Sequence, residues 1–222
     1  MTWITYDSRT ALFAGAAARI AGDITAALTE NSRISIAVPG GTTPGPVFDD
    51  LAQRALDWAR VTVMLSDERW VPADHERSNA GLLRARLLTD RAAAAEFVAF
   101  FEEGDLDEQV AQKASHISQS LPLDVLVLGM GGDMHTASLF PNAPGLDAAL
   151  TADAPALVTL RPEDQPDIRV SLSGRVLSSA ARKHLLITGE DKKAAFERAA
   201  ELPVAQAPIN VARDGLTVHW AE

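Results

Sequence analysis

The sequence contains no cysteine among its 222 residues. That absence excludes disulfide bonds, zinc sites with thiolate ligands and a cysteine nucleophile, so any chemistry must use carboxylates, hydroxyl groups, histidine or lysine. Basic residues are also scarce, because 20 Lys and Arg stand against 30 Asp and Glu, for a net charge of −10 with His neutral. Without a run of five basic residues, the chain lacks the electrostatic pattern that a polyphosphate backbone requires. We therefore expect no nucleic-acid partner, although a few arginines around a pocket would still bind a small anion.

Long apolar runs are missing as well. No segment approaches the roughly 20 apolar residues of a membrane span, and the N-terminal MTWITYDSRT carries Asp7 in place of the apolar core of a signal peptide. We expect no membrane association and a cytoplasmic location. The remaining composition, 47% hydrophobic and 23% charged, is ordinary for a soluble globular protein.

The chain shows no repeat, low-complexity tract or convincing linker. Its most loop-like segment, LRPEDQPD (160–167), is too short to be a domain boundary. Its length allows one large domain or two small ones. We expect a single domain over residues 1–222.

Short β-rich runs alternate with amphipathic helical segments, a pattern typical of βαβ units and a mainly parallel sheet. The expected strands cover 34–38, 61–65, 97–101, 124–129, 156–160, 168–172 and 184–188, and the clearest helical segments cover 47–56, 79–88 and 107–121. The strands are almost continuously apolar, which fits a sheet covered by helices on both faces. We predict a doubly wound, Rossmann-like α/β fold, in which ligands bind beyond the carboxyl ends of the strands.

The loop after the first of these strands reads PGGTTPGP (39–46). Gly40 and Gly41 allow the backbone to approach a ligand closely, and Thr42 and Thr43 add hydroxyl groups just before a helix, as in a phosphate-binding loop. No Gly-Lys-Ser/Thr follows, so a nucleotide-binding P-loop is excluded. A plain strand-to-helix turn with a threonine cap and a proline in the first turn remains the alternative.

The second informative loop, SDERWVP (66–72), places Asp67, Glu68 and Arg69 directly after a buried strand. Consecutive side chains there point in different directions, so at least one can face a cleft. The alternative is a solvated loop with a local ion pair.

The third loop, GMGGDMHTASLF (129–140), sets Asp133 and His135 two residues apart. Met134 occupies the third glycine position of a dinucleotide fingerprint, so that interpretation is weak. His135 has no second histidine at i+4, the chain has no HExxH, and its other histidines are scattered, which argues against a zinc site. No GxSxG nucleophile motif occurs. His135 is left as a core histidine or as a base, which would most simply activate water.

The remaining candidate cations are Arg169, which opens an apolar strand, and Lys192 and Lys193 near the start of a helix with acids in its first turn. Taken alone, the two lysines are best interpreted as surface charges.

Four blocks taken together resemble the 6-phosphogluconolactonase family. They are PGGTTP (39–44), SDERWVPADHERSNAGL (66–82), DVLVLGMGGDMHTASLFP (124–141) and RVSLSGRVLSSAARKHLLITGEDKKAAFERA (169–199). The third block is the most specific, and the resemblance spans about residues 34–200. It implies an enzyme that hydrolyses a lactone ester, 6-phospho-D-glucono-1,5-lactone, in the oxidative pentose phosphate pathway, on a Rossmann-like fold shared with amino-sugar-phosphate isomerases. Neither a metal nor a nucleotide cofactor is then needed.

The same resemblance implies roles for individual residues. His135 would be the general base that activates water, and Asp133 would orient its ring or stabilise the imidazolium. The substrate phosphate would bind the Gly40–Thr43 loop, with Arg169 and Lys192 as counter-charges. Asp67 and Arg69 would be cleft residues that contact the sugar hydroxyls or the phosphate. The expected partner is therefore a small sugar phosphate; a monomer is compatible with the sequence, which does not otherwise predict an oligomeric state.

As a further hypothesis, the backbone N–H groups of Gly131 and Gly132 would stabilise the oxyanion.

Three positions depart from the family pattern. Pro39 stands in place of serine and removes an N–H from the phosphate loop. Met134 replaces glycine, which would strain the turn if the position requires a positive φ. Gly132 replaces proline and loosens the turn.

Two other functions stay open. An amino-sugar-phosphate deaminase or isomerase shares the Asp-x-His pattern but continues with Asn-Glu-Pro, where this chain has Ala-Ser-Leu-Phe. A non-catalytic sugar-phosphate sensor would keep the cations and could lose the base, but this chain retains both Asp133 and His135.

Overall fold

The computed structural model describes residues 1–162 and 165–222, so Glu163 and Asp164 of the loop-like segment lie outside the described residues. Within that part of the chain the strands form a seven-stranded and a three-stranded sheet. In spatial order the large sheet contains β1 (Thr2–Thr5), β10 (Leu216–Ala221), β9 (Arg182–Thr188), β6 (Val125–Leu128), β2 (Ile34–Val38), β3 (Val61–Leu65) and β5 (Glu96–Val98). Every pairing in this sheet is parallel.

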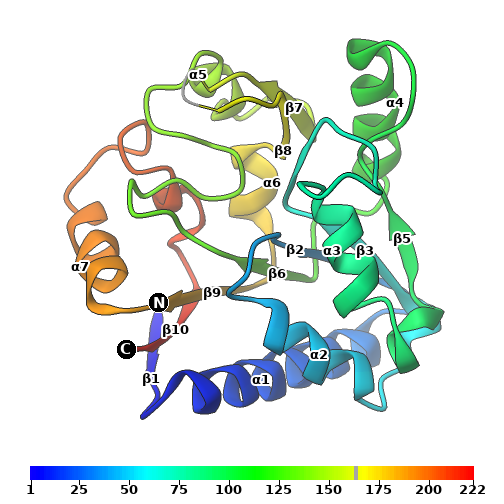
Figure 1. Cartoon of the computed structure of the whole chain (residues 1–222), viewed down its shortest axis with the longest axis vertical. Coiled ribbons are helices and arrows are strands. Elements are labelled where there is room, and N and C mark those ends of the chain that lie inside the picture. Colours follow the sequence, from blue (N-terminus) through cyan, green and yellow to red (C-terminus); the bar gives the residue numbers. More distant parts are fainter. Residues whose placement is uncertain (163–164) are drawn as a thin grey trace.

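Helices cover both faces of the large sheet, as the near-continuous apolar strands predicted. Figure 1 shows α1 and α2 on one side and α6 and α7 on the other. The α-helices are α1 (Arg9–Glu30), α2 (Gly45–Gln53), α3 (Asn79–Arg86), α4 (Leu106–Ser118), α5 (Leu146–Ala149), α6 (Gly174–Ser179) and α7 (Glu190–Ala199). Short 3-10 helices span Trp58–Arg60, Asp90–Ala94 and Pro208–Ala212. The doubly wound α/β prediction is confirmed.

The first and last strands lie side by side. β1 pairs with β10, and Figure 1 shows the two ends of the chain close together. This pairing joins the two ends of the chain in one sheet, and the single domain over residues 1–222 stays a prediction.

The longest helix, α1, begins at an N-cap serine, Ser8, whose hydroxyl accepts from the Ala11 N–H. Its buried residues recur every three or four positions from Leu12 to Ala27, so one face packs in the core. One 18-residue window of α1 has a mean hydropathy of 1.4. By length and composition α1 therefore passes as a membrane span, which corrects the expectation that no such segment exists, but a core helix passes the same test.

The smaller sheet was not predicted. β4 (Asp67–Arg69), β8 (Arg169–Leu172) and β7 (Leu157–Leu160) pair antiparallel in that order. Two runs that were expected to extend the parallel sheet, 156–160 and 168–172, belong here instead. The strand expected at 97–101 ends at Val98, and the helix expected over 47–56 ends at Gln53.

The strand order locates the binding crevice. From β2 the chain moves outward through β3 to β5, then returns to β6 on the other side of β2. In open α/β sheets, ligands bind where the order reverses, outside the carboxyl ends of the strands. The loop that follows β2 is the segment 39–46, which we call the glycine–threonine loop. The loop that follows β6 is the segment 129–140, which we call the histidine loop.

Candidate active site

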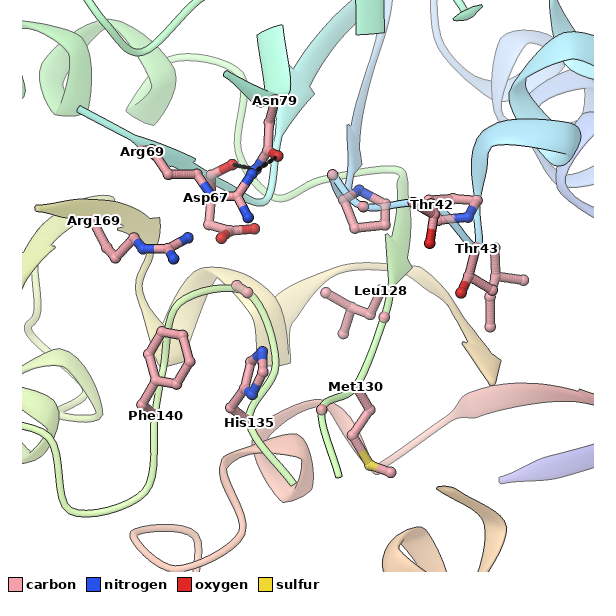
Figure 2. A pocket seen from close by; sticks show the side chains of 18 of the residues that line it. Thr42, Thr43, Asp67, Arg69, Asn79, Leu128, Met130, His135, Phe140 and Arg169 are labelled. Carbon is pink, nitrogen blue, oxygen red and sulfur yellow. Dashed lines mark hydrogen bonds between the residues drawn. The ribbon is translucent and has the colours of Figure 1, made fainter. Parts of the chain in front are cut away.

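A cavity of about 360 Å³ lies at this point. Nine of the ten site residues expected from the sequence line it: Gly40, Gly41, Thr42, Thr43, Asp67, Arg69, His135, Arg169 and Lys192. The tenth, Asp133, does not line it but contacts His135. Figure 2 shows Thr42 and Thr43 on one side of the cavity, Arg69 and Arg169 on the other, and His135 between and below them.

The glycine–threonine loop connects β2 to α2 in a conformation that suits a ligand. Gly41 has φ +89°, which favours glycine. Gly40 faces Asn79 so closely that an added β-carbon would lie 1.9 Å from Asn79 Oδ1. The N-cap of α2 is Pro44, with no side-chain cap. The threonines therefore do not cap the helix, and both line the cavity.

The histidine loop holds an acid–histidine pair. Nδ1 of His135 lies 2.6 Å from Oδ1 of Asp133. Because a carboxylate only accepts hydrogen bonds, Nδ1 carries the proton and the Nε2 lone pair is left as the basic site. Burial alone would raise the pKa of Asp133, but the hydrogen bond and charge of His135 outweigh it and lower that pKa. Asp133 is therefore an ionised partner of the imidazole.

The backbone of this loop explains how the pair is held. The Gly131 N–H donates to the His135 carbonyl at 3.0 Å, and the Met134 N–H donates to the Gly131 carbonyl at 3.0 Å. Met134 has φ +70°, so this position does require the left-handed backbone at which methionine is unfavourable. The oxyanion hypothesis is wrong for the Gly131 amide, because that N–H is already used within the turn. For the Gly132 amide it stays a prediction.

The aromatic ring of Phe140 contacts both His135 and Arg169. The rings of His135 and Phe140 stack with their centroids 4.3 Å apart, and Cζ of Arg169 lies 5.9 Å from the Phe140 centroid. Phe140 was not among the predicted site residues.

Two arginines lie on neighbouring strands of the small sheet. Arg69 of β4 and Arg169 of β8 are cross-strand partners, an arrangement that is unfavourable for like charges. Burial and the charge of Arg69 lower the pKa of Arg169, while Asp67, Asp167 and Glu68 act in the opposite direction. The buried Nε atoms of both arginines have no hydrogen-bond partner among the described residues. A bound anion would relieve both the repulsion and the missing hydrogen bonds.

The side chains of Asp67 and Glu68 point to opposite faces of β4, as those of successive residues in a strand do. Asp67 lines the cavity, and Ser66 and Ser138 donate hydroxyl hydrogen bonds to its two carboxylate oxygens at 2.9 and 2.6 Å. Glu68 points away and is fully buried. The prediction that part of this triplet faces a cleft is confirmed.

Lys192 lies in the first turn of α7, the helix that follows β9. It is half-buried, lines the cavity and donates to the Met130 carbonyl. Burial lowers the pKa of Lys192, and the Asp133 carboxylate acts in the opposite direction. The surface-charge alternative is therefore wrong for Lys192 but fits Lys193, which lies over the Trp220 ring and pairs with Glu190.

Tertiary structure adds lining residues that sequence reasoning missed. The polar ones are Asn79 and Gln165, whose Oε1 accepts from Arg169 Nη2 at 2.7 Å. Asn79 belongs to the block 66–82 that resembles the 6-phosphogluconolactonase family. Its place directly after Ser78 in that block was the only sequence signal that could have identified it. The apolar ones include Leu128, Met130 and Leu186. Among the described residues no group of three or more His, Asp or Glu side chains is arranged to hold a metal ion.

Comparison with known proteins extends over nearly the whole chain. Residues 7–220 match the family model described as glucosamine-6-phosphate isomerases/6-phosphogluconolactonase. A 6-phosphogluconolactonase from Pseudomonas aeruginosa is 41% identical over 211 residues, covering 93% of this chain and 89% of the relative. One from Caulobacter vibrioides is 39% identical over 223 residues, covering 98% and 96%.

The structure gives the same result. The crystal structure of a 6-phosphogluconolactonase from Shewanella baltica superposes with a TM-score of 0.94 at 33% identity, covering 100% of this chain and 98% of that one. The chain therefore belongs to the family of glucosamine-6-phosphate isomerases and 6-phosphogluconolactonases, and within this family of enzymes to the 6-phosphogluconolactonases.

Proposed function

We propose that the protein hydrolyses 6-phospho-D-glucono-1,5-lactone to 6-phospho-D-gluconate in this cavity, as a step of the oxidative pentose phosphate pathway. The observation that carries the proposal is the Asp133–His135 pair at the edge of a cavity that also holds three cationic side chains. A lone base would suit many reactions, and lone cations would suit any anion. The combination of a base with cations fits a substrate that has both an uncharged ester group and an anionic phosphate group.

In this proposal His135 acts on water. Its Nε2 takes a proton from a water molecule as the oxygen attacks the lactone carbonyl, and Asp133 stabilises the resulting imidazolium. When the tetrahedral intermediate collapses, the bond from the carbonyl carbon to the ring oxygen breaks, and the imidazolium returns the proton to that oxygen. The net change is addition of one water molecule, and the new carboxylic acid ionises at neutral pH.

The phosphate end of the substrate would bind the Gly40–Thr43 loop, with Arg169 and Lys192 as counter-charges. The loop offers main-chain N–H groups and two hydroxyls, and the cations form charge-assisted hydrogen bonds to phosphate oxygens. Pro39 offers no N–H, so the donors come from the residues after it.

Asp67 and Arg69 would contact the sugar hydroxyls or the phosphate. Both carboxylate oxygens of Asp67 already accept hydroxyl hydrogen bonds. Asp67 would act as an acceptor for sugar hydroxyls and as a counter-charge to the arginines.

A panel of three substrates tests the proposal. We expect fast hydrolysis of 6-phosphogluconolactone above its spontaneous opening, a much higher KM for unphosphorylated gluconolactone, and no turnover of glucosamine 6-phosphate. Deamination of glucosamine 6-phosphate with no lactone hydrolysis would favour the isomerase branch of the family. Binding of 6-phosphogluconate without turnover of either substrate would favour a sensor.

A further inference from the structure

Asn79, the first residue of α3, joins two parts of the site. Its side chain is buried, with 3% of the residue exposed. Oδ1 accepts from Nη1 of Arg69 at 2.8 Å, and Nδ2 donates to the Asp67 carbonyl at 2.9 Å. The same amide group fills the space directly opposite Gly40. The Asn79 side chain thus contacts both strand β4 and the glycine–threonine loop. Figure 2 shows it beside Arg69 and Asp67.

The fully buried carboxylate of Glu68 holds this asparagine in place. It accepts hydrogen bonds from the main-chain N–H groups of Arg69, Asn79 and Ala80 at 2.7, 2.8 and 2.7 Å, and from the Ser78 hydroxyl at 3.1 Å. All four donors are neutral, and burial raises the pKa of Glu68 against their effect. A buried carboxylate is costly unless it is fully hydrogen-bonded. Here its bonds fasten β4 to the first turn of α3.

These contacts fix one edge of the Arg69 guanidinium and leave its other N–H groups available to a ligand. Nη1 donates to the carbonyl of Arg77 and to Asn79, while Nε is buried without a partner among the described residues. An arginine side chain that is free to rotate must lose that freedom when it binds an anion. One that is already held does not.

We propose that Asn79 is a positioning residue that holds the Arg69 guanidinium in the cavity ready for the substrate, and that the buried Glu68 carboxylate holds Asn79 in turn. The inference rests on the proposed function for the identity of the ligand. It adds a device that preorganises the site, and it assigns the amide of Asn79 to orienting Arg69.

A double-mutant cycle on ligand binding tests this inference, with 6-phosphogluconate as the probe and calorimetry as the measurement. Asn79→Ala and Arg69→Met are each expected to raise Kd about tenfold, the loss typical of a hydrogen bond to a charged group. Because Asn79 acts through Arg69, the double variant is expected to bind about as weakly as Arg69→Met alone. A hundredfold loss in the double variant, or unchanged Kd in Asn79→Ala, would overturn the inference.

Two further variants separate positioning from folding. Leu83→Ala removes a fully buried core side chain of α3 and leaves the hydrogen bonds of Glu68 and Asn79 in place. It is expected to lower Tm while Kd stays within about twofold. If Asn79→Ala fails to fold, Asn79→Ser takes its place in the cycle, since its short hydroxyl also loses the contact with Arg69. Absence of lactone hydrolysis in the wild type would refute the proposed function and would leave the outcome of this binding cycle readable.

Discussion

Replacing Gly131 by alanine should damage the acid–histidine pair with little effect on the rest of the fold. A β-carbon at this position would lie 2.2 Å from Nδ1 of His135 and 2.3 Å from Oδ1 of Asp133. Contacts shorter than 3.0 Å essentially never occur for real β-carbons, so both side chains must move. Ordinary van der Waals contact begins near 3.4 Å, which requires a shift of about 1 Å.

The size of the effect follows from that shift. A misplacement of about 1 Å can cost on the order of 10²-fold in rate. We therefore expect kcat/KM for 6-phosphogluconolactone to fall about 10²-fold. The loss should appear mainly in kcat, because Gly131 lies beside the base and not beside the cations. The affinity for 6-phosphogluconate should change by less than about threefold.

The neighbouring glycine provides a matched control. A β-carbon on Gly132 would meet nothing within 4 Å. Gly132→Ala should therefore keep activity within about twofold, in the same turn and with the same added methyl group. Both variants are assayed by coupling the product to 6-phosphogluconate dehydrogenase, with spontaneous hydrolysis subtracted. Equal activities of the two variants, with both folded by circular dichroism, would refute the account of how the base is held.

Three further predictions concern charge, backbone strain and pH. Lys192→Met should raise KM about 10-fold or more with a smaller change in kcat, whereas Lys193→Met should leave steady-state kinetics unchanged; equal KM values would contradict the phosphate assignment. Met134→Gly relieves a positive φ worth about 1–2 kcal/mol but empties a buried site worth about 2–5 kcal/mol, so urea unfolding should show a net loss of stability. Burial lowers the pKa of His219 to about 3, below the unfolded value of 6.5, so its stabilising effect is complete above pH 6.5 and is lost as pH falls towards 3. Between pH 7.5 and 5 this loss is about 2 kcal/mol, and urea titrations should show a smaller pH dependence for His219→Gln than for the wild type.

The strands that could be predicted from the sequence are those with continuous apolar runs. β2 and β3 are buried along their full length, so every residue is apolar or small and the run stands out. β10 is buried as well, but it contains Thr217 and His219, which interrupt the apolar pattern. The buried His219 ring finds a hydrogen-bond partner in the Tyr6 hydroxyl, which lies 2.9 Å from its Nδ1. That partner comes from the other end of the chain and is not visible in the local sequence.

The site was predictable where its residues follow strands directly. The topology of a parallel sheet brings the ends of β2 and β6 together, so both glycine-rich loops were identified as candidates. Asn79 and Phe140 were missed because their roles depend on tertiary contacts, with Arg69 in one case and with the His135 ring in the other. The pairing of β4 with β8 was missed for the same reason, since a three-residue polar strand has no apolar period to detect.

The most direct test of the central claim compares the wild type with His135→Asn in the coupled lactonase assay, corrected for spontaneous ring opening. We expect fast turnover by the wild type and a loss of about 10²–10⁴-fold in kcat for the variant, with binding of 6-phosphogluconate retained. Near-wild-type turnover by His135→Asn would contradict the assignment of the base, and a wild type no faster than the background would contradict the proposed reaction itself.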